Sequence, residues 1–263
     1  MTERSLIQDL FGVEGKVVLI TGGSAGIGES LAEGFVRAGA RVYVSSRKAE
    51  VCEATAAALS EHGECIALPA DIGTAEGRAT VVEELMRRET RLDVLINNAG
   101  TMWAAPLAEY PESAWDKVYD VNVKGPFFLV QGLLPLLVAA ATREDPARII
   151  TVGSIQGFSV PTHETYAYSS SKAAMHQLGR HLARRLAELN ITSNVIAPGM
   201  FPSKMMEATI AARGEDAVLE RVPLKKFVGP SDMAGAAIYL ASKAGAAVTG
   251  MILTVDGGTA TTL

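Results

Sequence analysis

Short apolar runs alternate with helical periodicity along most of this chain. The apolar runs resemble strands buried on both faces, and they cover residues 16–21, 41–45, 64–68, 92–96, 148–152, 191–197 and 251–255. Helical spacing extends to about residue 38 after the first run, and covers about 49–62, 74–89, 112–141, 164–189 and 230–242 further on. Because strands that alternate with helices form parallel sheets, the pattern predicts an α/β fold: a doubly wound parallel sheet of about seven strands with helices on both faces.

Two segments fall outside this alternation. Residues 1–13 show no periodicity and are predicted to be an arm that leads into the fold. Residues 200–228 are loop-like and contain several methionines, which is typical of a mobile substrate lid. No repeat, low-complexity segment or linker interrupts the sequence, so residues 1–263 are predicted to form one domain.

Composition narrows the classes of function. The chain is 48% hydrophobic and 20% charged, as in soluble globular proteins, and its net charge of −5 gives no reason to expect nucleic acid. No apolar run reaches the roughly 18 residues of a membrane span, because Gln131, Gly132 and Pro135 interrupt the longest one. Cys52 and Cys65 fit no ligand spacing, and no histidine has an acidic neighbour at such a spacing. We therefore expect that the protein binds no metal, that both cysteines are reduced thiols and that the protein is cytoplasmic.

A glycine-rich turn joins the first predicted strand to the first predicted helix. Residues 21–28 read Thr-Gly-Gly-Ser-Ala-Gly-Ile-Gly. Gly22, Gly26 and Gly28 let the backbone approach a phosphate and let the helix pack on the strand, while the N–H groups of the helix N-terminus attract the anion. Between a strand and a helix, such a turn predicts a dinucleotide site of the Rossmann type.

Several further polar or turn-forming residues come at the ends of strands. Gly22, Asp71, Asn97, Ser154 and Pro198 all lie at or just past the carboxyl end of a predicted strand. Ligands of doubly wound sheets bind beyond these ends. We therefore expect these residues to gather around one site.

The predicted helix 164–189 carries Tyr168 and Lys172, which are four residues apart and therefore share a face. A neighbouring ammonium favours the phenolate, so the pKa of Tyr168 is expected to fall from about 10 toward neutrality. A tyrosine in that state exchanges protons at working pH. Tyr166 has no lysine four residues later, and His176 is expected to lie away from the Tyr168 face.

Together these residues resemble the short-chain dehydrogenase/reductase family over about residues 13–258. The motifs that carry the resemblance are Thr-Gly-x-x-x-Gly-Ile-Gly at 21–28, Asp71, Asn-Asn-Ala-Gly at 97–100, Asn122, Ser154, Tyr-x-x-x-Lys at 168–172 and Pro-Gly at 198–199. Residues 98–101 and 197–204, with Trp103, further resemble the rhamnolipid type of 3-oxoacyl-carrier-protein reductase. The resemblance implies a Rossmann-fold enzyme that transfers a hydride between nicotinamide and a ketone or secondary alcohol.

The resemblance also implies a catalytic set of four residues: Asn122, Ser154, Tyr168 and Lys172. Tyr168 would donate the proton in reduction, or accept it in oxidation. Lys172 would hold down the pKa of Tyr168 and bond the nicotinamide ribose. Ser154 would stabilise charge that develops on the substrate oxygen. Asn122 would hold a water that links Lys172 to solvent.

The cofactor contacts follow from the same resemblance. Asp71 and Ile72 would touch the adenine, and Ser203 would bond the nicotinamide amide in place of the threonine often found there. The full set of expected contacts is Gly22, Ser24, Ala25, Gly26, Ile27, Gly28, Ser46, Arg47, Lys48, Asp71, Ile72, Asn98, Ala99, Gly100, Tyr168, Lys172, Pro198, Gly199 and Ser203.

The end of the second predicted strand favours NADP(H) over NAD(H). An acid there would bond the ribose 2′-hydroxyl of NAD, whereas an arginine suits the 2′-phosphate of NADP. The chain has Ser46 and Arg47 at this point and no acid until Glu50. Arg47 can bind phosphate through charge-assisted hydrogen bonds. Ala25, where some NADP enzymes carry a basic residue, weighs the other way.

Mostly apolar side chains are predicted to surround the substrate. The expected substrate contacts are Trp103, Ser154, Gln156, Phe158, Tyr168 and Phe201. With Val160, Met205 and Met206, the apolar members favour an acyl or other non-polar carbonyl over a free sugar. His163 lies in the loop between Ser154 and Tyr168, where a plain loop position is the simpler interpretation.

The sequence is also compatible with other functions and with several partners. A dehydrogenase of polyols, sugars or steroid alcohols would use the same fold and residues. A non-catalytic NADP-sensing module would have a broken catalytic set. The resemblance implies a homotetramer, and an acyl carrier protein or a CoA thioester would be the partner of a 3-oxoacyl reductase. Two basic groups could dock an acidic carrier or be solvated charges: Arg180 with Arg184 and Arg185, and Lys225 with Lys226.

Overall fold

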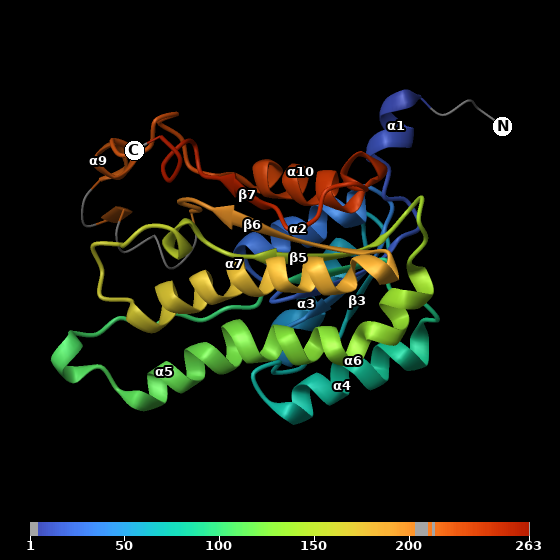
Figure 1. Cartoon of the computed structure of the whole chain (residues 1–263), viewed down its shortest axis with the longest axis horizontal. Coiled ribbons are helices and arrows are strands. Elements are labelled where there is room, and N and C mark those ends of the chain that lie inside the picture. The colour runs from blue at the N-terminus through green and yellow to red at the C-terminus, as the bar shows by residue number, and fades with distance from the viewer. Residues whose placement is uncertain (1–4, 203–209, 212–213, 263) are drawn as a thin grey trace.

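Seven parallel strands form one sheet at the centre of the molecule (Figure 1). The computed structural model describes residues 5–202, 210–211 and 214–262. The strands are β1 (Val17–Thr21), β2 (Arg41–Ser45), β3 (Cys65–Ala67), β4 (Val94–Asn97), β5 (Ala147–Val152), β6 (Ile191–Pro198) and β7 (Ile252–Val255). Their order in the sheet is β3-β2-β1-β4-β5-β6-β7. This order and the parallel pairing confirm the predicted doubly wound sheet.

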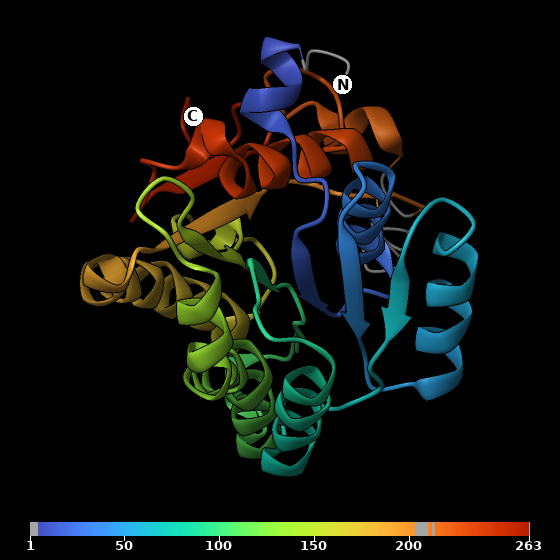
Figure 2. The same cartoon turned by 90° about the vertical axis from the view of Figure 1, so that its right-hand side faces the viewer.

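Helices cover both faces of the sheet (Figures 1 and 2). One layer contains α2 (Gly26–Arg37), α3 (Ala49–Leu59) and α10 (Pro230–Ala241), and the other contains α4 (Ala75–Arg88), α6 (Gly125–Ala140) and α7 (Tyr166–Leu186). Each layer buries its own apolar cluster against the strands, with Phe35 and Leu240 on the first face and Leu85 and Leu133 on the second. Burial of this apolar surface is the main force that holds the layers together.

The order of the strands reverses between β1 and β4. Chain segments leave β1 toward β2 on one side and leave β4 toward β5 on the other. The connections that follow the two strands therefore diverge, and their carboxyl ends, at Thr21 and Asn97, open a crevice. This crevice is where the predicted functional residues converge.

Two elements differ from the sequence prediction. Within residues 1–13, predicted as an arm without periodicity, the chain forms the helix α1 (Leu6–Phe11). The Ser5 side chain accepts from the Gln8 backbone and Gln8 bonds back to Ser5, a reciprocal capping box that starts the helix. The long helix predicted over 112–141 is α5 (Glu112–Tyr119) and α6 joined by a π-helical turn, Asp120–Lys124.

The predicted lid, 200–228, lies partly outside the described residues. Its described part contains the short helix α9 (Glu215–Leu219). The Val228 backbone N–H donates to the Met200 carbonyl at 2.9 Å, so the two ends of the segment meet.

The continuous helical stretch Glu112–Ala140 is long and apolar enough to cross a membrane by length and composition alone. Its Leu129, Leu133 and Leu137 are fully buried in the apolar cluster under the sheet. Core helices of layered α/β folds are often as long and as apolar as this stretch. The burial of these leucines indicates that the stretch is such a core helix.

Candidate active site

A cleft of about 340 Å³ opens at the carboxyl ends of β1, β2 and β4. Segments that are far apart in the sequence form its walls, including the glycine-rich turn, the end of β2, the residues after β3 and the residues after β4. The lining residues are Gly22, Ser24, Ala25, Ser45, Ser46, Arg47, Lys48, Val51, Ala70, Asp71, Ile72, Ala99, Gly100, Thr101 and Val121. The fold thus brings most of the predicted cofactor residues together.

The glycine-rich turn has the backbone geometry that glycine permits. Gly22 and Gly26 have φ angles of +66° and +55°, in the left-handed region. A Cβ on Gly28 would stand 2.0 Å from the Gly22 carbonyl oxygen, so only glycine fits there. The N-cap of α2, Ala25, offers no side-chain acceptor, which leaves the first N–H groups of the helix available to an anion.

Asn98 holds this turn from the neighbouring strand end. Its Nδ2 donates to the Thr21 and Gly22 carbonyls at 3.0 and 3.1 Å. The Thr21 hydroxyl in turn accepts from the backbone N–H groups of Asn98 and Ala99, both at 3.1 Å. Asn98, predicted as a cofactor contact, therefore holds the turn in place. Thr21, which belongs to the glycine-rich motif but was not among the predicted contacts, supports it.

The β2 end of the cleft offers free donors. The Ser46 hydroxyl is buried and has no hydrogen-bond partner in the described part of the chain. Arg47 is exposed and forms no ion pair with a described residue. A phosphate would satisfy both groups, so the donor set at this point fits the 2′-phosphate of an NADP molecule.

Asp71 and Ile72 form the opposite wall of the cleft. The Asp71 carboxylate accepts from the Gly73 N–H at 2.9 Å, which closes a turn just before α4. The Ile72 side chain is almost fully buried beside it. Both residues line the cleft, and their contact with an adenine stays a prediction.

The predicted catalytic residues lie next to this cleft, because a Cβ on Gly100 in its wall would stand 3.5 Å from the Asn122 Oδ1 and 3.7 Å from the Lys172 Nζ. Ser154 follows β5 directly, and its hydroxyl accepts from the Gln156 N–H at 3.1 Å, which starts a short 3-10 turn over Ile155–Gly157. The Ser154 side chain also lies near the Tyr168 phenol of α7, where it acts to lower the pKa of that phenol. One helical turn further along, the Lys172 Nζ donates to the Val152 carbonyl at 2.8 Å and lies 5.5 Å from the centre of the Tyr168 ring.

The pKa of Tyr168 departs from the prediction. It is raised rather than lowered, because burial disfavours the phenolate more than the nearby Ser154 side chain favours it. Burial also lowers the pKa of Lys172 to about 8. The expectation from the sequence was wrong because spacing shows that two side chains are neighbours but not how dry their surroundings are. The phenol is therefore protonated at neutral pH, which suits a proton donor.

Asn122 lies in the π-helical turn between α5 and α6, with its side chain facing Thr101 and α7. Its Oδ1 accepts from the Thr101 N–H at 2.8 Å, and its Nδ2 donates to the Thr101 carbonyl and to the Ser171 hydroxyl, both at 3.0 Å. Such turns often occur at functional sites. Thr101 and Ser171 support Asn122, and no motif in the sequence pointed to either.

His176 lies on the same face of α7 as Tyr168 and Lys172, which contradicts the sequence prediction. The three residues are spaced by four, so they form one stripe along the helix. The His176 ring is 4% exposed, and neither of its nitrogens has a hydrogen-bond partner among the described residues. Desolvation, together with Lys172 and Arg180, lowers the pKa of His176 to about 4.

The predicted substrate residues divide into two groups. Trp103 and Phe158 are 44% and 51% exposed, and Gln156 accepts hydrogen bonds from Thr165 and Ser169 beside the catalytic helix. Phe201, by contrast, is 8% exposed and packs in the apolar cluster on the α2 face of the sheet. Its prediction as a substrate contact is corrected to a core position, since sequence cannot distinguish a buried phenylalanine from one that lines a pocket.

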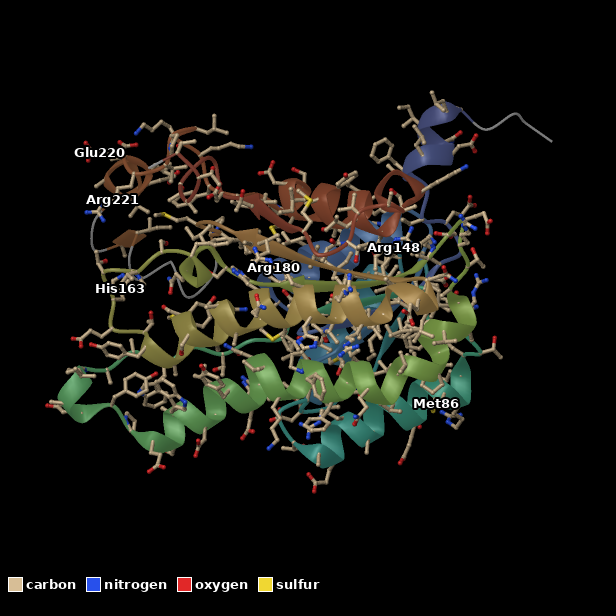
Figure 3. All side chains as sticks on the ribbon, viewed as in Figure 1. Met86, Arg148, His163, Arg180, Glu220 and Arg221 are labelled. Atoms are coloured by element: carbon tan, nitrogen blue, oxygen red, sulfur yellow. The ribbon has the colours of Figure 1, made fainter. Side chains whose placement is uncertain are left out.

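Other predicted positions have mixed outcomes. Pro198 ends β6, and the Gly199 N–H after it donates to the Val255 carbonyl at 2.9 Å. Val160 is almost fully exposed, and His163 is exposed at the carboxyl end of the sheet (Figure 3). The predicted residues Ser203, Met205 and Met206 lie outside the described residues.

The two basic groups lie away from the catalytic set or are already paired. Arg184 and Arg185 are in the last turn of α7, at the opposite end of the helix from Tyr168, and Arg180 lies nearer its middle (Figure 3). Lys226 pairs with Asp232 at 3.2 Å. Within the described ranges, no group of three or more His, Cys, Asp or Glu side chains could hold a metal ion.

Comparisons with known proteins agree with this geometry. Residues 16–214 match the short chain dehydrogenase family. The chain is 45% identical to a rhamnolipids biosynthesis 3-oxoacyl-[acyl-carrier-protein] reductase of Pseudomonas aeruginosa, over 94% of this chain and 97% of the relative. It is 33% identical to a 5-keto-D-gluconate 5-reductase of Escherichia coli, over 96% of this chain and 98% of the relative.

Solved structures show the same likeness. An RhlG/NADP active-site complex of Pseudomonas aeruginosa superimposes with a TM-score of 0.92 at 45% identity, over 96% of this chain and 99% of the other. A 7 alpha-hydroxysteroid dehydrogenase, complexed with NADH and 7-oxo glycochenodeoxycholic acid, gives 0.89 at 31% identity, over 95% and 96%.

Proposed function

This chain belongs to the short-chain dehydrogenase family of oxidoreductases, and from that premise we propose that it is an NADPH-dependent reductase of 3-oxoacyl thioesters or other apolar ketones. The reaction would run in reverse on the secondary alcohol. The observation that carries the proposal is that Lys172, which shares a helix face with Tyr168, lies beside Gly100 in the wall of the cleft that the glycine-rich turn and Arg47 border. A Cβ on Gly100 would stand 3.7 Å from the Lys172 Nζ.

The cofactor in this proposal is NADP(H). Its diphosphate would bind the free N–H groups at the start of α2, and its 2′-phosphate would bind the unpartnered Ser46 hydroxyl and Arg47. The bound nicotinamide supplies the hydride. The relative complexed with NADP supports this choice over NAD.

The protein's part in the reaction is to bind the carbonyl oxygen and to deliver a proton to it. Ser154 would donate a hydrogen bond to that oxygen and stabilise the negative charge that develops there. Tyr168 would donate the proton, and its raised pKa keeps it in the protonated form. The Lys172 ammonium would stabilise the phenolate that remains, and Asn122 would place a water between Lys172 and solvent.

The substrate proposal rests on the exposed apolar side chains near the catalytic set. Trp103 and Phe158 offer apolar surface to an acyl chain. A relative that reduces 3-oxoacyl-[acyl-carrier-protein] supports an acyl thioester. The alternative substrate is a polar or a steroid alcohol. The relatives named for 5-keto-D-gluconate and for a steroid support this alternative.

The proposed enzyme would act as a cytoplasmic homotetramer that takes its substrate from an acyl carrier protein or as a CoA thioester. Exposed Trp115, Phe127 and Val138 on α5 and α6 support an interface on that face. Size-exclusion chromatography with light scattering tests the oligomeric state, and a monomer would refute the tetramer.

A panel of carbonyl compounds tests the function. Acetoacetyl-CoA, 5-keto-D-gluconate and a keto bile acid are each offered with NADPH or NADH, and cofactor oxidation is followed. We expect the highest kcat/KM with acetoacetyl-CoA and NADPH. Faster reduction of the keto sugar or the keto steroid would overturn the substrate proposal. Binding of NADPH without turnover of any carbonyl would favour a sensing module instead.

A further inference from the structure

His176 fills the space between α7 and the turn that carries Ser154. A Cβ on Gly153 would meet the His176 Nε2 at 2.5 Å, and a Cβ on Gly157 would meet its Cε1 at 2.5 Å. The Phe158 ring lies over the same imidazole, with 4.5 Å between ring centres. Gly153, Gly157 and Phe158 therefore enclose the imidazole ring.

This contact continues the row of contacts that α7 makes with the end of β5. Tyr168 lies near Ser154, Lys172 donates to the Val152 carbonyl, and His176 packs against Gly153 and Gly157. Each member of the stripe thus meets a different part of the segment 152–157. The spacing between the helix and this segment sets how far the Ser154 hydroxyl lies from the Tyr168 phenol.

The His176 side chain is buried, and neither of its ring nitrogens has a hydrogen-bond partner among the described residues. A buried imidazole without hydrogen bonds is less favourable than an apolar side chain of the same size. Burial, and after it the charges of Lys172 and Arg180, lower the pKa of His176, so the ring is neutral at pH 7. With both nitrogens unpartnered, what the ring contributes here is its flat shape rather than a bond.

We propose that His176 is a positioning residue for the proposed reduction: its ring acts as a spacer that holds the 153–157 segment, and with it Ser154, at the right distance from Tyr168. The inference rests on the proposed function. Fixed spacing matters because a displacement of about 1 Å between reacting groups can lower a rate by about 100-fold.

Three variants test the spacer directly. His176→Ala removes the ring, and we expect kcat with acetoacetyl-CoA to fall about 10- to 100-fold while KM for NADPH changes less than about 3-fold. His176→Phe keeps a flat ring and should restore kcat to within about 5-fold of the wild type. His181→Ala, an exposed histidine on the same helix, is the matched control and should behave like the wild type.

A double-mutant cycle gives the sharper test. All three nearest neighbours of a Cβ on Gly157 are His176 atoms, and Gly157 does not have a positive φ, so Gly157→Ala clashes with this ring without straining the backbone. We expect Gly157→Ala to lower both kcat and the unfolding temperature. The double variant with His176→Ala should recover both relative to Gly157→Ala alone.

The outcomes separate the inference from the proposed function. Unchanged kcat in His176→Ala would overturn the spacer role, as would a Phe variant no better than the Ala variant. Losses that simply add in the double variant would also overturn it. If the wild type reduced no carbonyl, the proposed function would fail, while the unfolding temperatures and NADPH affinities of the four cycle members would still test the packing. If His176→Ala did not fold, His176→Phe and Gly157→Ala would carry the comparison.

Discussion

Charged side chains surround a cavity both at the carboxyl ends of the strands, here called the carboxyl edge of the sheet, and at their amino ends, here called the amino edge. The two edges differ in whether these charges have partners. At the amino edge, Arg41 pairs with Glu64 at 2.8 Å and with Glu89 at 3.1 Å. At the carboxyl edge, Arg47 and the buried Ser46 hydroxyl have no such partner among the described residues. Figure 3 shows the two edges at opposite ends of the molecule, with His163 at the carboxyl end and Arg148 toward the other.

Cavity size does not reveal which edge binds a ligand. The amino-edge cavity, about 450 Å³, is larger than the carboxyl-edge cleft of about 340 Å³. The amino edge uses its charges to join elements: Arg148 donates to the Leu240 and Ser242 carbonyls of the α10 end and to Asp145. Charges with partners stabilise a fold, whereas polar groups without partners are available to a ligand. We therefore expect variants at the two edges to affect different quantities.

The largest effect on activity is expected for Lys172→Met at the carboxyl edge. Methionine fills the buried space but removes the ammonium, so kcat/KM should fall about 10²- to 10⁴-fold. The unfolding temperature should change little, because removal of a buried charge offsets the loss of the donor to the Val152 carbonyl. Steady-state kinetics and calorimetry on the same samples measure both. A Lys172→Met enzyme with near-normal activity would show that the two edges do not differ in this way.

The converse is expected for Arg148→Met at the amino edge. This change removes a donor from the buried Leu240 carbonyl and one of the two donors to the Ser242 carbonyl, which still accepts from the Gly245 N–H. It also removes the ion pair with Asp145, so the free energy of unfolding should fall by about 2–4 kcal/mol. Chemical denaturation measures that loss, and kcat per folded molecule should be unchanged. An intact stability with reduced kcat would contradict the division of roles between the edges.

A smaller effect is expected from charge reversal near the cleft. Arg47→Asp should reduce the preference for NADPH over NADH by about 10- to 100-fold, because the 2′-phosphate loses a cationic partner and meets an anion. Arg41→Asp at the amino edge is the matched control and should leave the preference as it is. Ratios of kcat/KM for the two cofactors decide the point. A preference retained in Arg47→Asp would remove this residue from the phosphate site.

An effect of acid on stability is expected from His176, which lies close to the carboxyl edge. The pKa of His176 is about 4 in the folded chain and about 6.5 when unfolded, so the unfolded chain binds more protons between these values. Stability should therefore fall as the pH drops from about 6.5 toward about 4, by at most about 3 kcal/mol from this residue. Lys172 and Arg180 are the charged groups that face the ring, and the residues packed on it from the 153–158 segment carry no charge.

His176→Phe removes this titration. The variant should lose less stability than the wild type when denaturation is compared at pH 7 and pH 5. Equal losses in the two proteins would show that His176 titrates normally in the folded state.

The fold could be predicted because the alternation of apolar runs and helical spacing is a property of the sequence itself. The catalytic stripe was only partly predictable. Tyr168 and Lys172 stood out by their spacing, and His176 has the same spacing from Lys172, so correct counting along the helix would have found it. The capping pair Ser5 and Gln8 likewise announces α1 in the sequence.

Other features depend on burial, which the sequence does not reveal. The raised pKa of Tyr168 arises from the dryness of the assembled site, and Phe201 proved to be a core residue. Thr101 and Ser171 support Asn122 only because a π-helical turn rotates Asn122 toward them. Such turns have no sequence signal comparable to a capping residue.

One pair of variants tests the central claim, that the carboxyl edge delivers a proton from Tyr168 during hydride transfer. Tyr168→Phe and Tyr166→Phe each lose one phenol at the start of the same helix, and Tyr166 bonds to Glu164 rather than to Ser154. The measurement is NADPH oxidation with acetoacetyl-CoA beside the NADPH dissociation constant. We predict that Tyr168→Phe loses at least about 10²-fold in kcat with NADPH binding retained, whereas Tyr166→Phe stays within about 5-fold of the wild type. Unimpaired turnover in Tyr168→Phe would contradict the mechanism.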